Sequence, residues 1–310
     1  MFFVLKLHFH ADCDGITSAY FVSNELDRLK IKHSLHPSLS SEVEVKGKNN
    51  ITLDLSSVKT DSIQNFSIDH HVSERLNLVY TNPRRSGFEW PVSFTTYALF
   101  GEIKDAWKSA LAVVADWGAE TVPRQFWETV KKRWPTLVPK IKQEVLVKSK
   151  LGEMALMIDC HVALYRSKGA MQALAALKEA KSPGSFLRGE GKARALKASK
   201  AKVLKEVKSI FGRDEVHKKF VLIRFQSKNR IKSLVAAFAK DKYPKKMIII
   251  AQDEKDTIRL SFRHGDNLNV LVKTLTKDIG GGGGHPRASG GHVQKDQWDL
   301  FYSRLTKKFG

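Results

Sequence analysis

The first half of the chain alternates short apolar segments with longer amphipathic ones. Residues 2–10 are rich in Phe, Val and Leu and predict a buried strand that ends before Gly15. Residues 16–30 place their apolar side chains on one side of a helix. The pattern predicts further strands at 51–55 and 66–69, and helices around 93–101, 105–115 and 123–134. Strands interleaved with helices predict an α/β domain with a mainly parallel sheet, in which ligand sites lie beyond the carboxyl ends of the strands.

The second half begins with helical sequence and ends in a second α/β pattern. Residues 151–212 predict helices, and within them 190–212 form a basic helix with an apolar stripe. Breaks at Pro183-Gly184 and at Gly189–Gly191 precede that helix. The pattern then predicts strands at 220–226, 246–252 and 257–263, and helices near 267–278 and 295–308. The run Gly280–Gly284 and the residues after it are expected to form a loop between the last two helices.

The chain carries a large positive charge that is concentrated in its second half. Its 310 residues include 53 Lys and Arg against 32 Asp and Glu, a formal charge of +21. Residues 1–150 carry a net +3, residues 151–310 a net +18, and residues 181–250 alone a net +15. A concentrated basic surface favours a polyanionic partner such as nucleic acid over a merely solvated lysine-rich face.

Cysteine content and hydropathy suggest a cytoplasmic protein. The two cysteines, Cys13 and Cys160, are too few for a metal cluster or a disulfide framework. No apolar run approaches the roughly 18 residues of a membrane span, and the N-terminal segment lacks the features of a signal peptide. We therefore expect a cytoplasmic location and no membrane partner.

Four acidic motifs each follow an apolar segment of the first domain. They are the segment HADCDG at residues 10–15, Asp54 in ITLDLS, Asp69-His70-His71 in FSIDHHV, and Asp116 in LAVVADWG. A single Asp at such a position is usually a cap or turn residue. Four of them, two with histidines, are better explained by a bound cation, because carboxylates brought together without one repel each other and raise their own pKa values. Mixed carboxylate and imidazole ligands suit Mn²⁺, with Zn²⁺, Fe²⁺ and Mg²⁺ as alternatives.

The order and content of these motifs resemble the DHH phosphoesterase superfamily, which includes RecJ-type nucleases, nanoRNases and manganese pyrophosphatases. The later GGGGHPRASGG looks like the signature of the DHH-associated domain of the nuclease branch, and IRLSFRH is similar to its Ser-x-Arg strand. Size, charge and layout look closest to archaeal RecJ-like exonucleases, a group that includes helicase-associated nucleases. The resemblance implies a DHH catalytic domain over 1–185, a basic helical linker over 186–214 and a DHH-associated substrate-binding domain over 215–310.

The resemblance implies two bound Mn²⁺ ions, with Mg²⁺ as an alternative. His10, Asp12 and Asp54 would hold one ion. Asp14, His70 and Asp116 would hold the other, with Asp54 bridging the two. Asp69 would orient a neighbouring histidine, and His71 would face the scissile phosphate. His8 is an alternative to His10, because residues two apart on a strand share a face.

The C-terminal glycine motif is a candidate phosphate-binding segment. Glycines let backbone N–H groups approach a phosphate closely, and arginine makes forked contacts with phosphate oxygens. A flexible linker is the ordinary alternative for a glycine run. By resemblance, the residues that contact the nucleotide would be Arg263, Gly283, Gly284, His285, Arg287 and Ser289.

The favoured function is a metal-dependent exonuclease on single-stranded DNA or RNA, with 3′→5′ polarity by resemblance. Two cations can bind the phosphate oxygens, lower the pKa of a water and stabilise the leaving oxygen. The alternatives are a small-substrate phosphoesterase (a nanoRNase, a phosphoadenosine-phosphate phosphatase or a cyclic-dinucleotide phosphodiesterase) and a non-enzymatic scaffold, which the full ligand set disfavours. A helicase or another replication or repair protein is a plausible partner by resemblance alone.

Overall fold

A five-stranded parallel sheet forms the centre of the N-terminal unit, which comprises residues 1–200. The structure, a computed structural model, describes residues 4–71, 78–116, 118–137, 149–212, 214–285 and 288–309. The sheet order is β2–β1–β4–β6–β7, formed by Leu5–His10 (β1), His33–Ser38 (β2), Asn50–Leu53 (β4), Phe66–Ile68 (β6) and Val79–Thr81 (β7). Strands β3 (Glu42–Val45) and β5 (Ser57–Thr60) form a separate parallel pair. All carboxyl ends of the main sheet therefore lie at one edge.

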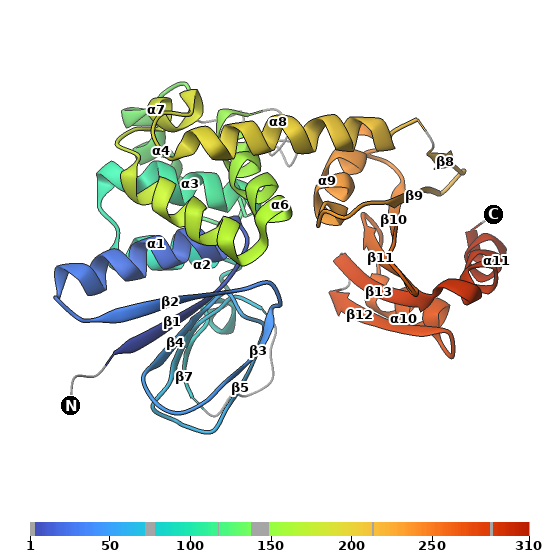
Figure 1. Cartoon of the computed structure of the whole chain (residues 1–310), viewed down its shortest axis with the longest axis horizontal. Coiled ribbons are helices and arrows are strands. Elements are labelled where there is room, and N and C mark those ends of the chain that lie inside the picture. Colours follow the sequence, from blue (N-terminus) through green and yellow to red (C-terminus); the bar gives the residue numbers. More distant parts are fainter. Residues whose placement is uncertain are drawn as a thin grey trace. The chain divides into compact units, whose positions relative to one another are not determined.

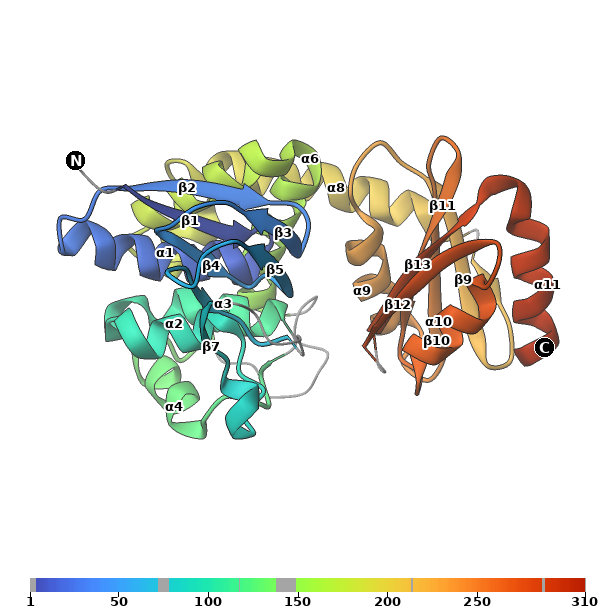
Figure 2. The same cartoon turned by 90° about the horizontal axis from the view of Figure 1, so that it is seen from below.

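The helices of this unit bury the apolar stripes that the sequence predicts. Cys13–Arg28 (α1), Ala106–Ala115 (α3) and Lys150–Glu179 (α6) pack against one another (Figures 1 and 2), while Val92–Phe100 (α2) contacts α1, and Arg124–Arg133 (α4) contacts α3. Phe9, Ile16, Leu53 and Leu111 are completely buried. Short 3₁₀ helices occur at Pro83–Ser86 (η1) and Ile103–Asp105 (η2). No helix in the described part of the chain has both the length and the apolar character that crossing a membrane requires.

The long helical region predicted over 151–212 consists of three helices. Helix α6 is interrupted at Arg166, whose φ of 56° is left-handed. Helix α7 (Pro183–Arg188) starts with Ser182 as its cap and ends at Gly189, whose φ is 76°. Helix α8 (Ala193–Ile210) is the predicted basic helix, and it runs across the division between the two units at residue 200. The domain boundaries at 185 and 214 stay predictions.

The C-terminal unit, residues 201–310, is built on a mixed six-stranded sheet of order β12–β13–β11–β10–β9–β8. Its strands are Glu215–Val216 (β8), Phe220–Gln226 (β9), Met247–Asp253 (β10), Thr257–Arg263 (β11), Gly280–His285 (β12) and Ala288–Gln294 (β13), and only β9 and β10 pair in parallel. Helices α10 (Leu268–Thr276) and α11 (Trp298–Phe309) share a core with Leu260 and Phe262 on one face, and the 3₁₀ helix η3 (Lys295–Gln297) leads into α11. Helix α9 (Lys232–Lys242) packs on β10 and β11 outside that core. The predicted α/β class of both parts is confirmed.

The prediction of a loop at the glycine run is wrong. Residues 280–285 form the edge strand β12, which pairs with β13 in antiparallel register from Gly280–Val293 to His285–Ala288. Glycine disfavours strands when considered alone, but here β13 supplies the hydrogen bonds that hold the extended chain. The sequence pattern also missed β2, β3, β5 and β7, which are short or only partly buried.

Candidate metal centre

The first acidic motif lies where β1 ends and α1 begins. Asp12 is the N-cap of α1 and accepts a hydrogen bond from the Gly15 N–H at 3.0 Å. A Cβ on Gly15 would lie 2.2 Å from the carbonyl oxygen of His10, so only glycine allows the first helical turn to lie against the strand end. This turn places His10 Nδ1 2.7 Å from Asp12 Oδ2.

Asp54 occupies the middle of the site. It follows β4 with a left-handed φ of 57°, which Asp tolerates better than most residues, and its N–H donates to the Ile68 carbonyl at 3.0 Å. Its side chain is almost fully buried, with Oδ2 3.5 Å from His10 Nδ1 and Oδ1 3.4 Å from His70 Nε2. Among the described residues, Oδ2 has no hydrogen-bond partner. The buried carboxylate therefore has an oxygen available to a cation.

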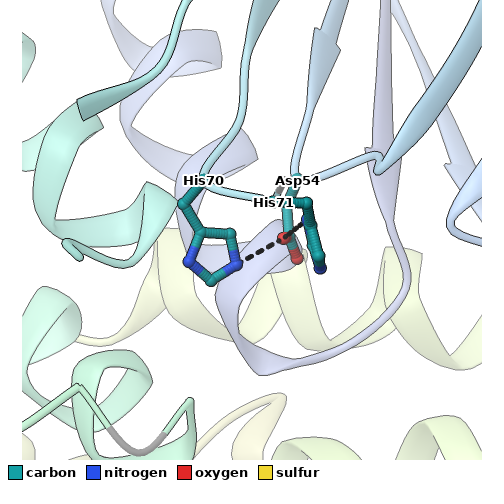
Figure 3. Close-up of side chains that lie close together, drawn as sticks. All are labelled: Asp54, His70 and His71. Atoms are coloured by element: carbon teal, nitrogen blue, oxygen red, sulfur yellow. Dashed lines mark ion pairs between the residues drawn. The ribbon is translucent and has the colours of Figure 1, made fainter. Parts of the chain in front are cut away.

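The Asp69-His70-His71 segment follows β6 and brings both imidazoles to Asp54 (Figure 3). Asp69 is completely buried, and its Oδ1 lies 2.7 Å from His71 Nδ1. The Tyr80 hydroxyl donates to Asp69 Oδ2 at 3.2 Å, and the backbone N–H of His71 donates to the same oxygen. His71 Nδ1 is 3.8 Å from Asp54 Oδ1. The buried Asp69 thus fixes the orientation of the His71 ring.

Asp14 and Asp116 complete the cluster from two other elements. Asp14 is buried, and its two carboxylate oxygens accept the backbone N–H groups of Val92 and Ser93, each at 2.9 Å, at the start of α2. Asp116 directly follows α3, and its Oδ2 lies 3.6 Å from His70 Nδ1. Asp14 therefore also anchors α2 to the site, a role that its place in the sequence did not indicate.

The side chains form three groups whose possible ligand atoms lie within 4.8 Å of one another. These groups are His10, Asp12 and Asp54; Asp14, His70 and Asp116; and Asp54, His70 and His71. The first two are the ligand sets expected for the two ions. The third shares Asp54 with the first group and His70 with the second, and it also includes His71. Carboxylate and imidazole donors in this mixture suit Mn²⁺, and the carboxylates also suit Mg²⁺.

The electrostatics of the cluster indicate a need for positive charge. Burial, followed by the neighbouring carboxylates, raises the pKa of Asp14, and burial raises the pKa of Asp116 to about 6. Although burial opposes each change, Asp12 and Asp54 raise the pKa of His10, and His10 and His70 lower the pKa of Asp54. Without a cation, protons therefore compensate the crowded carboxylates.

His8, the alternative to His10, lies outside the cluster that contains His10. Its Nε2 lies 3.0 Å from Asn50 Oδ1, and its ring stacks on His36 of β2 at a centroid distance of 4.9 Å. Neighbouring strands therefore engage the His8 ring, while His10 at the strand end meets Asp12 and Asp54.

Sequence reasoning missed Asp159, which lies on α6 beside the first motif. Burial and then Asp12 raise its pKa to about 8, and its Oδ1 has no hydrogen-bond partner in the described part of the chain. Its carboxylate accepts a hydrogen bond from the backbone of Cys13, the residue between the candidate ligands Asp12 and Asp14. A single carboxylate inside the apolar run MALMIDCHVAL was the signal that could have revealed it.

The predicted substrate residues of the C-terminal unit lie on three adjacent strands. Ser261 of β11 pairs with Gly290 of β13, which pairs with Gly283 of β12. Arg263 pairs with Ala288, which pairs with His285, and Gly284 pairs with Ser289. Ser289 is 2% exposed and lies opposite Phe262, on the core face, so its side chain does not share the face of Arg263. Arg287 lies outside the described residues.

A family model matches the C-terminal unit, and solved structures match the fold of the whole chain. Residues 217–310 match the DHHA1 domain family, so the C-terminal unit has a family assignment of its own. The fold of the whole chain is RecJ-like. No curated protein sequence matches the chain.

Three solved structures illustrate the likeness in fold. The DHH domain of a member of the s1p family of ribosomal proteins is 15% identical, with a TM-score of 0.66 over 97% of this chain and 86% of the other. Mn²⁺-bound RecJ from Thermus thermophilus is 13% identical, with a TM-score of 0.61 over 97% of this chain and 51% of the other. The pGpG-specific phosphodiesterase PggH from Vibrio cholerae is 14% identical, with a TM-score of 0.56 over 98% of each chain.

Proposed function

We propose that this chain is a two-metal phosphodiesterase that degrades single-stranded nucleic acid from its end, with 3′→5′ polarity favoured. The observation that carries the proposal is the convergence of four separate segments, one of them carrying Asp54, on a single cluster with two ligand groups of three side chains each. A buried carboxylate oxygen without a hydrogen bond among the described residues and two carboxyl groups with raised pKa values fit a site made for cations. Mn²⁺-bound RecJ and a pGpG-specific phosphodiesterase share this fold, which agrees with this chemistry.

The residues of the cluster have separate roles in this proposal. His10, Asp12 and Asp54 hold one Mn²⁺, and Asp14, His70 and Asp116 hold the second, with Asp54 shared and Mg²⁺ as the alternative ion. When bound, the ions supply charge neutralisation of the phosphate and a water of lowered pKa.

His71 and Asp69 act beside the ligands. Asp69 accepts a hydrogen bond from His71 Nδ1 at 2.7 Å and, although burial opposes the change, raises the pKa of His71, so the protonated ring can donate its Nε2–H to a phosphate oxygen. The exposed part of His71, 39% of its side chain, is consistent with contact to a substrate. Asp69 is thus a positioning residue, and His71 is the catalytic residue that touches substrate.

The proposed preference for a long nucleic-acid strand over a small substrate comes from the charge of the second half of the chain. Residues 181–250 carry a net charge of +15, which would follow a phosphate backbone and make binding strongly salt-dependent. In the proposal, Arg263, Gly283, Gly284, His285, Arg287 and Ser289 supply the substrate-binding segment of the DHHA1 domain. Cys13 and Cys160 are both unpaired and buried, which fits the reducing cytoplasm as the place of action. A helicase or another replication or repair protein is the proposed partner class.

A small-substrate phosphodiesterase is the second candidate. One observation favours it: this chain and the pGpG-specific phosphodiesterase align over 98% of both chains, whereas Thermus thermophilus RecJ is matched over 51% of its length and another Mn²⁺-bound RecJ over 89%. Such an enzyme needs the same metal cluster, but binding a small substrate does not require the concentrated positive charge of residues 181–250.

One digestion series separates the two candidates. Single strands labelled at either end, a duplex, a linear dinucleotide and phosphoadenosine phosphate are incubated with the protein in Mn²⁺, in Mg²⁺ and in EDTA. The exonuclease predicts progressive shortening of long strands from the 3′ end that stops in EDTA. Hydrolysis of the dinucleotide with intact long strands would establish the second candidate, and no hydrolysis in either metal would refute both.

A further inference from the structure

Two cationic side chains of the C-terminal unit contact the same strand, β11. Lys232 is the first residue of α9, and its Nζ donates to the carbonyl oxygen of Leu260 at 3.0 Å. Arg263 Nη1 donates to the carbonyl oxygens of Phe262 at 2.9 Å and Ser289 at 3.4 Å. Leu260 and Phe262 are two residues apart on one strand, so the carbonyls that the two cations contact are separated by about 7 Å.

Neither cation has a carboxylate partner among the described residues. In that part of the chain, no Asp or Glu oxygen lies within 4 Å of Lys232 or Arg263. Arg224 of the same sheet, by contrast, pairs with Asp253 at 2.9 Å. Burial lowers the pKa of both groups, and Arg263 further lowers that of Lys232, to about 8. Glu254 offsets part of this effect on Lys232, but neither cation forms an ion pair within the described residues. Partly buried cations without such a pair are unfavourable for the free protein, and an anion would relieve that penalty.

The strip of sheet beside Arg263 carries almost no side chains. Ser261 and Arg263 are on one face of β11, and Gly290 and Gly283 continue the row of Ser261 across the next two strands. A Cβ on Gly283 would meet nothing closer than Lys273 Cε at 3.6 Å, an ordinary contact, and its φ is not left-handed. Neither packing nor backbone conformation requires glycine there, whereas close approach of a phosphate to the backbone does.

We propose that Lys232 and Arg263 bind two successive phosphates of one nucleic-acid strand, so that Lys232 selects substrates with more than one phosphate. This inference rests on the proposed function, because it specifies which strands the phosphodiesterase accepts. Successive phosphates advance about 3.4 Å along the axis of a stacked strand and roughly twice that along an extended one, and the latter is comparable to the separation of the two carbonyls that the cations contact. Arg263 suits forked contact with one phosphate, and Lys232 acts as a point charge for the next.

Steady-state kinetics with two short substrates test this selection. A 5′-phosphorylated dinucleotide carries two phosphates, and the same dinucleotide without the 5′-phosphate carries one. For Lys232→Gln, we expect KM for the two-phosphate substrate to rise about tenfold, several times more than KM for the one-phosphate substrate. Lys232→Arg should restore most of the preference, because it restores the charge. Lys308→Gln, at an exposed position of α11, is the matched control and should change neither KM.

Binding by the metal-free protein separates failure of this inference from failure of the proposed function. Fluorescence anisotropy with a labelled trinucleotide in EDTA needs no hydrolysis. Loss of one phosphate contact in Lys232→Gln should lower the slope of log Kobs against log salt by about 0.7. If the wild type hydrolyses neither dinucleotide, the proposed function fails and the salt slope still decides the role of Lys232. An unchanged slope, or equal rises in KM for both dinucleotides, would overturn the inference.

Discussion

Replacing Lys232 by methionine should stabilise the protein at neutral pH. Burial first, and then Arg263 and Arg259, lower the pKa of Lys232 from 10.5 to about 8. At about 1.4 kcal/mol per pKa unit, keeping the ammonium group charged at pH 7 reduces the free energy of unfolding by about 3 kcal/mol. Methionine has a similar length and removes the charge, but it loses the hydrogen bond to the Leu260 carbonyl, worth about 1 kcal/mol. The expected net gain is about 2 kcal/mol.

The pH dependence gives this prediction a second, independent check. Between pH 8 and 10.5 the unfolded lysine keeps a proton that the folded one has lost, so the free energy of unfolding of the wild type rises with pH in this window. The advantage of Lys232→Met should therefore shrink from pH 8 upwards and vanish by about pH 10.5. Urea unfolding followed by circular dichroism at pH 7, 9 and 10.5 measures it, with the exposed Lys308→Met as control. A Lys232→Met protein no more stable than wild type at pH 7, or a gain that does not change with pH, would refute the reasoning.

Three further predictions concern the metal centre. Asp54→Asn should reduce Mn²⁺-dependent hydrolysis at least 100-fold with an unchanged circular dichroism spectrum, because asparagine tolerates the left-handed φ. The control Asp61→Asn, at an exposed position, should keep its activity within twofold of wild type. Near-normal activity of Asp54→Asn would exclude a bridging role. Gly15→Ala should lower the melting temperature by several degrees, since its Cβ would lie 2.2 Å from the His10 carbonyl; an unchanged melting curve contradicts the close contact. Without metal, the free energy of unfolding should fall by about 1–3 kcal/mol as the pH rises from 5.5 to 7.5, because carboxyls such as Asp159, with its pKa raised to about 8, hold protons only in the folded state. Saturating Mn²⁺ should reverse this trend in thermal melts. Equal trends with and without Mn²⁺ would argue against a cation site.

Local sequence pattern was enough to predict the elements with strong apolar periodicity. Strands β9 and β11 coincide with their predicted ranges, and helix α8 lies within three residues of its range, because their buried side chains repeat with the period of the element. The glycine run failed for the opposite reason. Glycine has no side chain to show a period, and β12 is extended only because β13 pairs with it.

The sequence by itself determined which groups could do chemistry: four acidic motifs at the ends of apolar segments, two histidine-bearing segments among them, and the excess charge of the second half. Only the tertiary structure decided which of these groups meet. It separated His8 from His10, brought Asp159 of α6 to the first motif, and brought Lys232 of α9 into contact with the strand that carries Arg263. The physical reason is that a side chain's type is local, whereas its partners and its burial depend on strands and helices that are far apart in the chain. Those partners and that burial set the pKa of each group and the cation or anion that it can bind.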